Sequence, residues 1–162
     1  MAVPSASPLF LREPEIRRGV ELLYFGYTNF TATADATLDG QGLGRAHHRA
    51  LYFIAQNPEM PVGDLLKLLR ITKQSLGRVL GDLSDRGYVE TTPGLRDRRQ
   101  RLLKLTEAGA ALEAELFEAI RAKMAEAYAQ AGQGSVTGFW RVLEGLIPEE
   151  QRTRIPNLGD VG

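Results

Sequence analysis

Apolar residues recur near the start of the chain at the spacing of one helix face. Steps of four, three, four and three residues separate the members of this row, which are Ile16, Val20, Leu23, Tyr27 and Phe30. Leu22 and Phe25 add a second apolar strip, so this helix needs two partners, such as its own domain and another subunit. The glycines at positions 40, 42 and 44 are predicted to end the helix.

A second helix is predicted over residues 43–56, where Asn57-Pro58 follows as a stop. Two short amphipathic helices come next, with only Arg70-Ile71 between them, and this arrangement predicts a helix-turn-helix. Thr72 is a suitable N-cap for the later helix, because its hydroxyl can accept a free backbone N–H. Gly87 suits a left-handed C-cap. The apolar stripe predicted to be buried in that helix is Leu76, Val79, Leu80 and Leu83.

The apolar period changes after the helix-turn-helix. Residues 88–92 and 101–105 are predicted as the strands of a hairpin, with Pro93-Gly94 as a turn, and a hairpin in this place is the wing of a winged helix. Thr106 is predicted to cap a long helix, and a last helix is predicted over residues 136–147. The residues predicted to be buried in the last helix are Val136, Phe139, Trp140, Leu143 and Ile147. The predicted fold class is mainly α with a small β-hairpin wing.

Charge changes this picture. The chain has 20 basic and 20 acidic residues and a formal net charge of zero, which argues against a generic polyanion binder. From Arg70 to Lys104, however, nine basic residues stand against four acidic ones (9 − 4 = 5), an excess typical of a nucleic-acid surface. The absence of cysteine excludes disulfides and thiolate metal sites. No apolar run approaches the roughly 20 residues of a membrane helix, and no secretory leader is recognised, so we expect the cytoplasm.

Polar residues early in the second helix of the motif are the candidates for reading bases in the major groove. They are Thr72, Lys73, Gln74, Ser75 and Arg78. Glutamine can pair with adenine and arginine with guanine, each good pair contributing roughly 1–3 kcal/mol of discrimination. Gly77 and Gly81 are unusual inside a helix, and they indicate either a close approach to DNA or, equally, drift at tolerant positions.

The wing supplies candidates for a narrow, negative minor groove. They are Arg96, Asp97, Arg98, Arg99 and Arg101. Asp97 is predicted to pair with Arg99 or Arg101 and to hold the shape of the hairpin. The alternative for both sets is a charged, solvated surface without a ligand.

The wing pattern Asp97-x-Arg99-x-x-x-Leu103-x-Leu105-Thr106-x-x-Gly109 follows the segment ITKQSLGRVLGDLSDRGYVE. With the helix order, it resembles the MarR family of bacterial transcription regulators over about residues 15–147. The resemblance implies a homodimer that binds a near-palindromic operator in double-stranded DNA, and in many relatives a small aromatic or phenolic effector releases the DNA. Here Gly94 stands where the family wing often has an acid, so a looser wing tip is predicted.

The resemblance also divides the chain. It implies dimerisation helices in residues 15–42 and 106–148 and a DNA-binding lobe in residues 43–105. Residues 1–14 are then a flexible arm, and residues 149–162 are a tail. A ligand wedged where the dimer helices meet the lobes would change the distance between the two DNA-reading helices, provided that it binds one arrangement more tightly.

The sequence offers few candidates for a metal, effector or catalytic site. His47 and His48 are adjacent on a helix and point about 100° apart, so a shared metal is not predicted, and one of them is expected at the junction with the DNA-reading lobe. Aromatic residues that could line an effector cavity, or that simply pack in a core or dimer interface, are Tyr24, Tyr27, Phe30 and Tyr52, together with His48. The chain has neither a phosphate-binding glycine loop nor a Ser/His/Asp set, so no enzyme activity and no cofactor are predicted.

The sequence therefore predicts a dimeric, sequence-specific, DNA-binding transcription regulator, a repressor in the simplest case, controlled by a small-molecule effector. Two alternatives stay open. The first is a winged-helix adaptor for protein contacts without DNA binding, which the zero net charge favours. The second is a DNA-binding regulator that lacks an effector.

Overall fold

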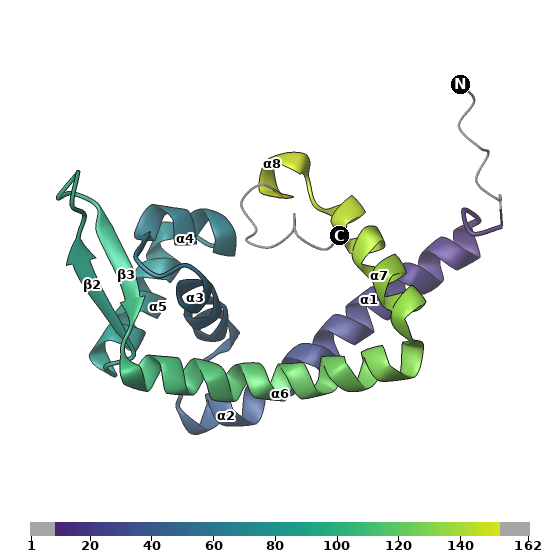
Figure 1. The fold of residues 1–162 in the computed structure, drawn as a ribbon, viewed down its shortest axis with the longest axis horizontal. Helices are drawn as coiled ribbons and strands as arrows, with labels where there is room; N and C mark the ends of the chain where they lie inside the picture. Colours follow the sequence, from purple (N-terminus) through teal and green to yellow (C-terminus); the bar gives the residue numbers. More distant parts are fainter. Residues whose placement is uncertain (1–8, 153–162) are drawn as a thin grey trace.

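The computed structural model describes residues 9–152. Within this range the chain forms helices and one three-stranded antiparallel sheet (Figure 1). In chain order the elements are α1 (Glu13–Ala32), α2 (Asp35–Gly40), α3 (Arg45–Gln56), β1 (Met60–Pro61), α4 (Val62–Leu69), α5 (Lys73–Asp85), β2 (Val89–Pro93), β3 (Arg101–Leu105), α6 (Glu107–Ala131), α7 (Gln133–Leu146) and α8 (Glu149–Arg152).

The long helix α6 connects two parts of the molecule (Figure 1). The winged lobe, made of α3, α4, α5 and the sheet, lies at the N-terminal end of α6, while α1 and α7 lie toward its other end. The β2–β3 hairpin projects away from this lobe. The predicted fold class is confirmed: the described chain is mainly helical, with a winged helix-turn-helix and a separate helical region.

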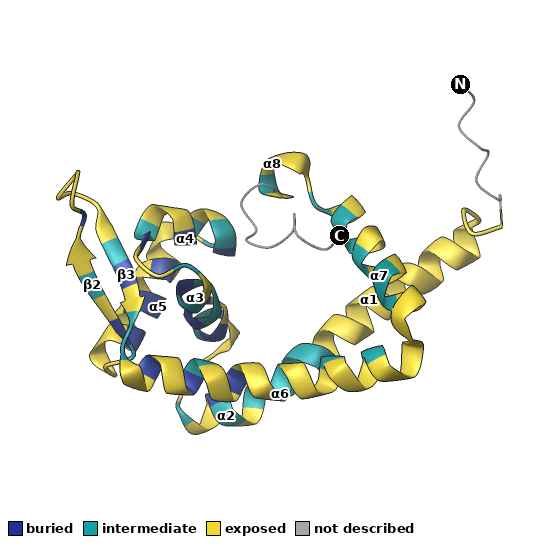
Figure 2. Ribbon diagram, viewed as in Figure 1, coloured by how far each residue is buried: buried dark blue, intermediate teal, exposed yellow. Residues whose placement is uncertain are grey.

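The core lies in the winged lobe, whereas the helical region is largely exposed (Figure 2). The largest fully buried side chains of the core come from six elements and pack as one cluster. Burying each such side chain stabilises the fold by roughly 1.5–3 kcal/mol. They are Leu38, Leu51, Ile54, Leu65, Leu76, Leu83, Leu103 and Leu116.

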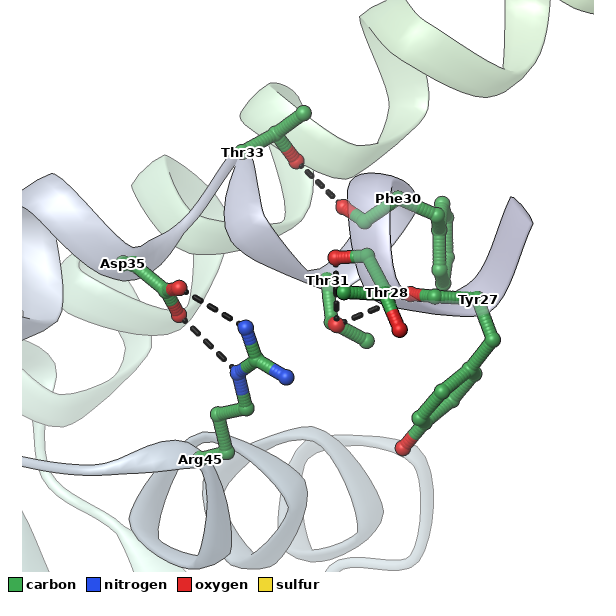
Figure 3. Close-up of polar contacts among 7 residues, drawn as sticks. All are labelled: Tyr27, Thr28, Phe30, Thr31, Thr33, Asp35 and Arg45. Carbon is green, nitrogen blue, oxygen red and sulfur yellow. Dashed lines mark hydrogen bonds and ion pairs between the residues drawn. The ribbon is translucent and has the colours of Figure 1, made fainter. Parts of the chain in front are cut away.

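The first helix ends earlier than the glycines at positions 40, 42 and 44 predicted. α1 stops at Ala32, and α2 is a separate helix that is anchored by the buried side chain of Leu38. The hydroxyl of Thr31 donates to the carbonyl of Tyr27 at 2.8 Å, and that of Thr33 donates to the carbonyl of Phe30 at 2.7 Å (Figure 3). Hydroxyls that bond back to the last turn bend or loosen a helix, which local periodicity could not reveal.

The helix-turn-helix follows its local predictions closely. α4 ends at Leu69, and its C-cap Arg70 has a left-handed φ of 52°. α5 begins after Thr72, whose Oγ1 accepts the backbone N–H of Ser75 at 3.1 Å. Gly87 has a φ of 74°, and the N–H of Tyr88 donates to the carbonyl of Leu83 at 2.9 Å, which closes the C-terminal end of α5. All four residues of the predicted stripe are buried.

The sheet contains one strand more than predicted. β2 and β3 form the expected hairpin, with Val89 opposite Leu105 and Pro93 opposite Arg101. The two-residue strand β1 pairs with the other side of β3 and places Met60 opposite Leu103. Two residues are too few for an alternating apolar pattern, so this strand is recognisable only from its partner.

The predictions of the last two long helices, α6 and α7, are confirmed as helices, but the predicted burial of α7 is wrong. Thr106 caps α6 as predicted, because its Oγ1 accepts the N–H of Gly109 at 3.0 Å. α7 begins at Gln133 rather than at residue 136. Although it was predicted to bury an apolar face, none of its residues 133–146, all within the described range, is buried, and Phe139 is 40% exposed. A single chain offers this face too little to pack against.

Candidate nucleic-acid interface

The DNA-reading candidates of α5 share its outer face. Thr72, Lys73, Gln74, Ser75 and Arg78 are all exposed, because the opposite stripe of the helix faces the core. The side chains of Lys73, Gln74 and Arg78 make no hydrogen bond or ion pair with any other residue of the described range 9–152. They are therefore available to an outside ligand.

Thr72 and Ser75 are partly engaged within the helix. The hydroxyl of Thr72 accepts the N–H of Ser75, and it donates to the hydroxyl oxygen of Ser75 at 2.8 Å. Thr72 thus has a structural role in starting α5. The hydroxyl hydrogen of Ser75 stays available to an acceptor such as a phosphate oxygen.

The wing loop is compact at its tip. The N–H of Gly94 donates to the carbonyl of Gln100 at 2.9 Å, and the N–H of Gln100 donates to the carbonyl of Asp97 at 3.0 Å. Gly94 is buried, and a Cβ placed there would lie 2.6 Å from the carbonyl oxygen of Asp97. The expectation of a looser tip is therefore wrong: the glycine allows a close approach that an acidic side chain would prevent.

Asp97 holds the loop in a different way from the one predicted. Its Oδ1 accepts the backbone N–H of Arg99 at 3.0 Å, and no ion pair joins it to Arg99 or Arg101 within the described residues. This local turn is typical of aspartate. The wing guanidiniums consequently remain uncompensated and exposed at Arg96, Arg98, Arg99 and Arg101.

His47 fastens α5 to α3. Its Nε2 lies 2.9 Å from Oδ2 of Asp82, and its Nδ1 accepts the backbone N–H of Gly44 at 3.0 Å. Because Nδ1 is an acceptor, the ring proton sits on Nε2 and is donated to Asp82. The expected histidine at the junction with the lobe is therefore His47. This bond engages the carboxylate of Asp82, which forms no ion pair with a lysine or arginine within the described residues.

The effector candidates come together only in part. Tyr24 and Tyr27 are exposed, whereas His48 is buried, and its burial lowers the pKa of the imidazole despite the nearby carboxylate of Asp35. Asp35 itself is bound by the guanidinium of Arg45, which lowers the pKa of the carboxyl and joins the start of α2 to α3 (Figure 3).

A hollow of about 270 Å³ lies between the last turn of α1 and the middle of α6. Its lining is Phe30, Phe117, Ile120, Arg121, Met124, Ala125 and Tyr128, so Phe30 belongs to both sets. Tyr52 borders it through a ring contact with Phe117, at 6.2 Å between centroids. Residues 9–152 contain no group of three or more His, Asp or Glu side chains that could hold a metal, and no helix there is long and apolar enough to cross a membrane.

Two features of this region were not singled out from the sequence. Leu95, at the wing tip, is completely exposed, and an apolar residue inside a charged loop is the pattern that could have drawn attention to it. Gln41 bonds to the turn after α5 through its backbone and its side chain. No local pattern indicates a pairing across more than forty residues.

The known proteins that are similar to this chain are transcription regulators. The family model that matches residues 41–100 is described as the MarR family. The HTH-type transcriptional regulator PetP of Rhodobacter capsulatus is 47% identical over 152 residues, which cover 94% of this chain and 92% of the relative.

Solved structures show the same fold. A mutant of MarR from E. coli complexed with operator DNA has a TM-score of 0.67 at 24% identity, covering 88% of this chain and 100% of that one. NadR in complex with 4-hydroxyphenylacetate has a TM-score of 0.68 at 21% identity, covering 90% of this chain and 96% of that one.

Proposed function

The chain belongs to the MarR family as a transcription regulator, and from this premise we propose that it binds a near-palindromic operator in duplex DNA as a homodimer whose affinity a small aromatic effector modulates. The observation that carries this proposal is that one lobe presents two exposed cationic elements whose basic side chains form no ion pair within the described residues. These are the N-terminal half of α5 and the arginine-rich wing.

The two elements suit the two grooves of DNA. Gln74 and Arg78 present the amide and guanidinium groups that recognise adenine and guanine edges in the major groove, each contact contributing roughly 1–3 kcal/mol of discrimination. Lys73 and Ser75 suit phosphate oxygens. The uncompensated arginines of the wing suit a narrow minor groove, where the negative potential is strongest.

The exposed apolar surface of the helical region supports a dimer. Large apolar side chains of α1 are 43–70% exposed in the single chain, and such a surface marks an interaction site. A two-fold pair presents two lobes and sets the half-sites about 34–36 Å apart, one turn of DNA. The exposed large apolar residues of α1 are Ile16, Val20, Leu22, Leu23, Tyr24, Phe25 and Tyr27, and those of α7 are Phe139, Val142 and Leu146.

We assign the DNA-binding lobe to residues 43–105 and the dimerisation helices to residues 15–42 and 106–148. Leu38 and Leu116 are fully buried in the core of the lobe, although both belong to the proposed dimerisation segments. The two regions therefore share packing, which gives dimer geometry a direct route to the lobes.

The hollow between α1 and α6 is the proposed effector site. Its lining is apolar and aromatic, and Arg121 contributes the carbon stem of its side chain, while its guanidinium forms an exposed ion pair with Glu118 at 2.6 Å. An aromatic acid could place its ring against Phe117 and its carboxylate near Arg121. NadR, with the same fold, binds 4-hydroxyphenylacetate, which is a ligand of this class. A panel of aromatic acids that includes this compound should raise the melting temperature if the site is used.

The test begins with selection of bound fragments from random duplex DNA, which reads the operator directly. The triple variant Arg96→Ala, Arg98→Ala and Arg99→Ala should lose most of the affinity, and the plot of log affinity against log salt should become shallower by about 0.9 for each lost phosphate contact. If the triple variant bound DNA as tightly as the parent, the assignment of the wing to DNA binding would be rejected. A parent that binds no duplex even in dilute buffer would favour the adaptor alternative, and sedimentation as a monomer would reject the dimer.

A further inference from the structure

The loop between α2 and α3 is bonded to the turn between α5 and β2. The guanidinium of Arg86 donates through Nη1 to the backbone carbonyl of Gln41, and Nη2 lies 3.5 Å from the carbonyl of Gly42. The hydroxyl of Tyr88 donates to Oε1 of Gln41 at 2.8 Å. Arg86 and Tyr88 flank the left-handed Gly87, so Gln41 is bonded to both neighbours of the glycine that follows α5.

The same turn also carries the start of α6. The hydroxyl of Thr106 donates to the carbonyl of Gly87 at 2.5 Å, and its N–H donates to the carbonyl of Tyr88 at 3.0 Å. Gly109 lies so close that a Cβ there would be 1.9 Å from the carbonyl oxygen of Tyr88. Three segments therefore meet at Tyr88: the α2–α3 loop, the end of α5 with the start of the wing, and α6.

This meeting point lies at the C-terminal end of α5, far along the helix from its DNA-reading first turns. The bond between His47 and Asp82 holds α5 in its last turn, three residues before the helix ends at Asp85. The buried stripe of α5 packs the helix against the core, and these two polar attachments near its C-terminal end restrict how far it can tilt on that core. The N-terminal, DNA-reading end of α5 is therefore positioned by contacts made at the C-terminal end of the helix.

We propose that Gln41, Arg86 and Tyr88 form a clamp that sets the angle of α5 and the wing relative to α1, α2 and α6, and so fixes the operator spacing that the dimer accepts. The clamp rests on the proposed function. Its residues are positioning residues, since none of them lies among the groups assigned to DNA. Arg86 and Gln41 belong to opposite sides of the contact, so a movement of α2 changes the end of α5 directly.

Operator spacing is the readout that tests the clamp. One base pair inserted between half-sites moves them about 3.4 Å apart and rotates them by roughly 35°. A rigid pair of lobes should therefore bind the altered operator much more weakly. Affinities are measured for a duplex obtained by selection with the parent protein and for the same duplex with one base pair inserted or removed.

Tyr88→Phe removes only the hydroxyl and keeps the ring, and Gln41→Ala removes the side-chain acceptor. Each should lower the parent's preference for the original spacing by about two- to tenfold, the equivalent of one lost hydrogen bond. Ile54→Val, a core variant that does not touch the clamp, should lose stability while keeping the parental preference. Circular dichroism and sedimentation establish that each variant is folded and assembled as the parent is.

The outcomes separate the two proposals. If Tyr88→Phe and Gln41→Ala both keep the parental ratio of affinities, the clamp is overturned while operator binding stands. If Ile54→Val lowers the ratio as much as they do, the effect comes from general loosening and the clamp is likewise overturned. If the parent binds no duplex, the proposed function fails, and the role of the clamp fails with it.

Discussion

His47 and Asp82 lie 2.9 Å apart, Nε2 to Oδ2, and this bond joins the first turn of α3 to the last turn of α5. Both ring nitrogens of His47 are used, because Nδ1 accepts the N–H of Gly44. The side chain is only 15% exposed, so the bond is partly shielded from water. One residue thus completes the start of one helix and orients another.

We expect His47 and Asp82 to be energetically coupled. A double-mutant cycle with His47→Ala and Asp82→Ala, followed by urea unfolding, should give a coupling of about 0.5–1.5 kcal/mol, the net contribution of a hydrogen bond. The pair Asp64 and Lys67 is the control, because both side chains are exposed and lie 3.7 Å apart, and its coupling should be close to zero. Equal coupling in the two pairs would contradict this interpretation.

Gly77→Ala should separate folding from DNA binding. A Cβ at Gly77 meets nothing within 4 Å, so alanine should stabilise the free protein by about 0.5–1 kcal/mol through its higher helix propensity. If α5 lies against a DNA strand, the same methyl group lowers operator affinity. Thermal unfolding and a binding titration are measured together, and we expect them to move in opposite directions. Unchanged affinity would mean that this face does not approach DNA closely.

Gly109→Ala should be far more damaging than other glycine substitutions in the helical region. The added Cβ would lie 1.9 Å from the carbonyl oxygen of Tyr88, so α6 must move away from the turn that it caps. We expect a loss of about 3 kcal/mol in the free energy of unfolding. Gly138→Ala in α7, where a Cβ meets nothing within 4 Å, is the matched control and should be neutral or stabilising. Similar stability of the two variants would disprove the close contact.

The buried imidazole of His48 should make stability depend on pH. Burial lowers its pKa below the ordinary value of 6.5, so the unfolded chain binds more protons than the folded one below that pH. The contribution of His48 to stability is therefore present above about pH 6.5 and is lost as the pH falls through 6.5 toward the folded pKa.

His48→Gln should flatten this part of the profile when urea unfolding is repeated across the range. Tyr52→Phe, one turn later on α3, keeps the imidazole and should retain the parental slope. A His48→Gln profile that parallels the parent would assign the pH dependence to other groups.

Leu95 should contribute to DNA binding without contributing to its salt dependence. The side chain is completely exposed at the tip of a cationic wing, where an apolar group can pack against bases or sugars in the minor groove. Leu95→Ser should weaken operator binding and leave the slope of log affinity against log salt unchanged, because no phosphate contact is lost. Arg98→Ala should lower that slope by about 0.9. Binding by Leu95→Ser that equals the parent's would exclude the apolar contact.

The features of this fold that can be predicted from the sequence are those that a few neighbouring residues determine. The Thr72 and Thr106 caps, the left-handed Gly87 and the stripe of α5 were all predicted, and the structure confirms them. Each depends on neighbours three to five positions away. The β2–β3 hairpin was predictable for the same reason, since a turn separates two short β-prone runs.

Local sequence signals are therefore sufficient for the order of the long helices, the helix-turn-helix and the presence of a wing, but not for the short helix α2. The tertiary structure decided that α1 stops at Ala32, that β1 pairs with β3, that Asp97 binds a backbone N–H rather than an arginine, and that Gln41 reaches Tyr88. Most of these pairings join atoms far apart in the chain, and the Asp97 bond depends on how the loop folds back on itself. Periodicity and capping describe a segment one turn at a time, and they carry no information on which segments meet.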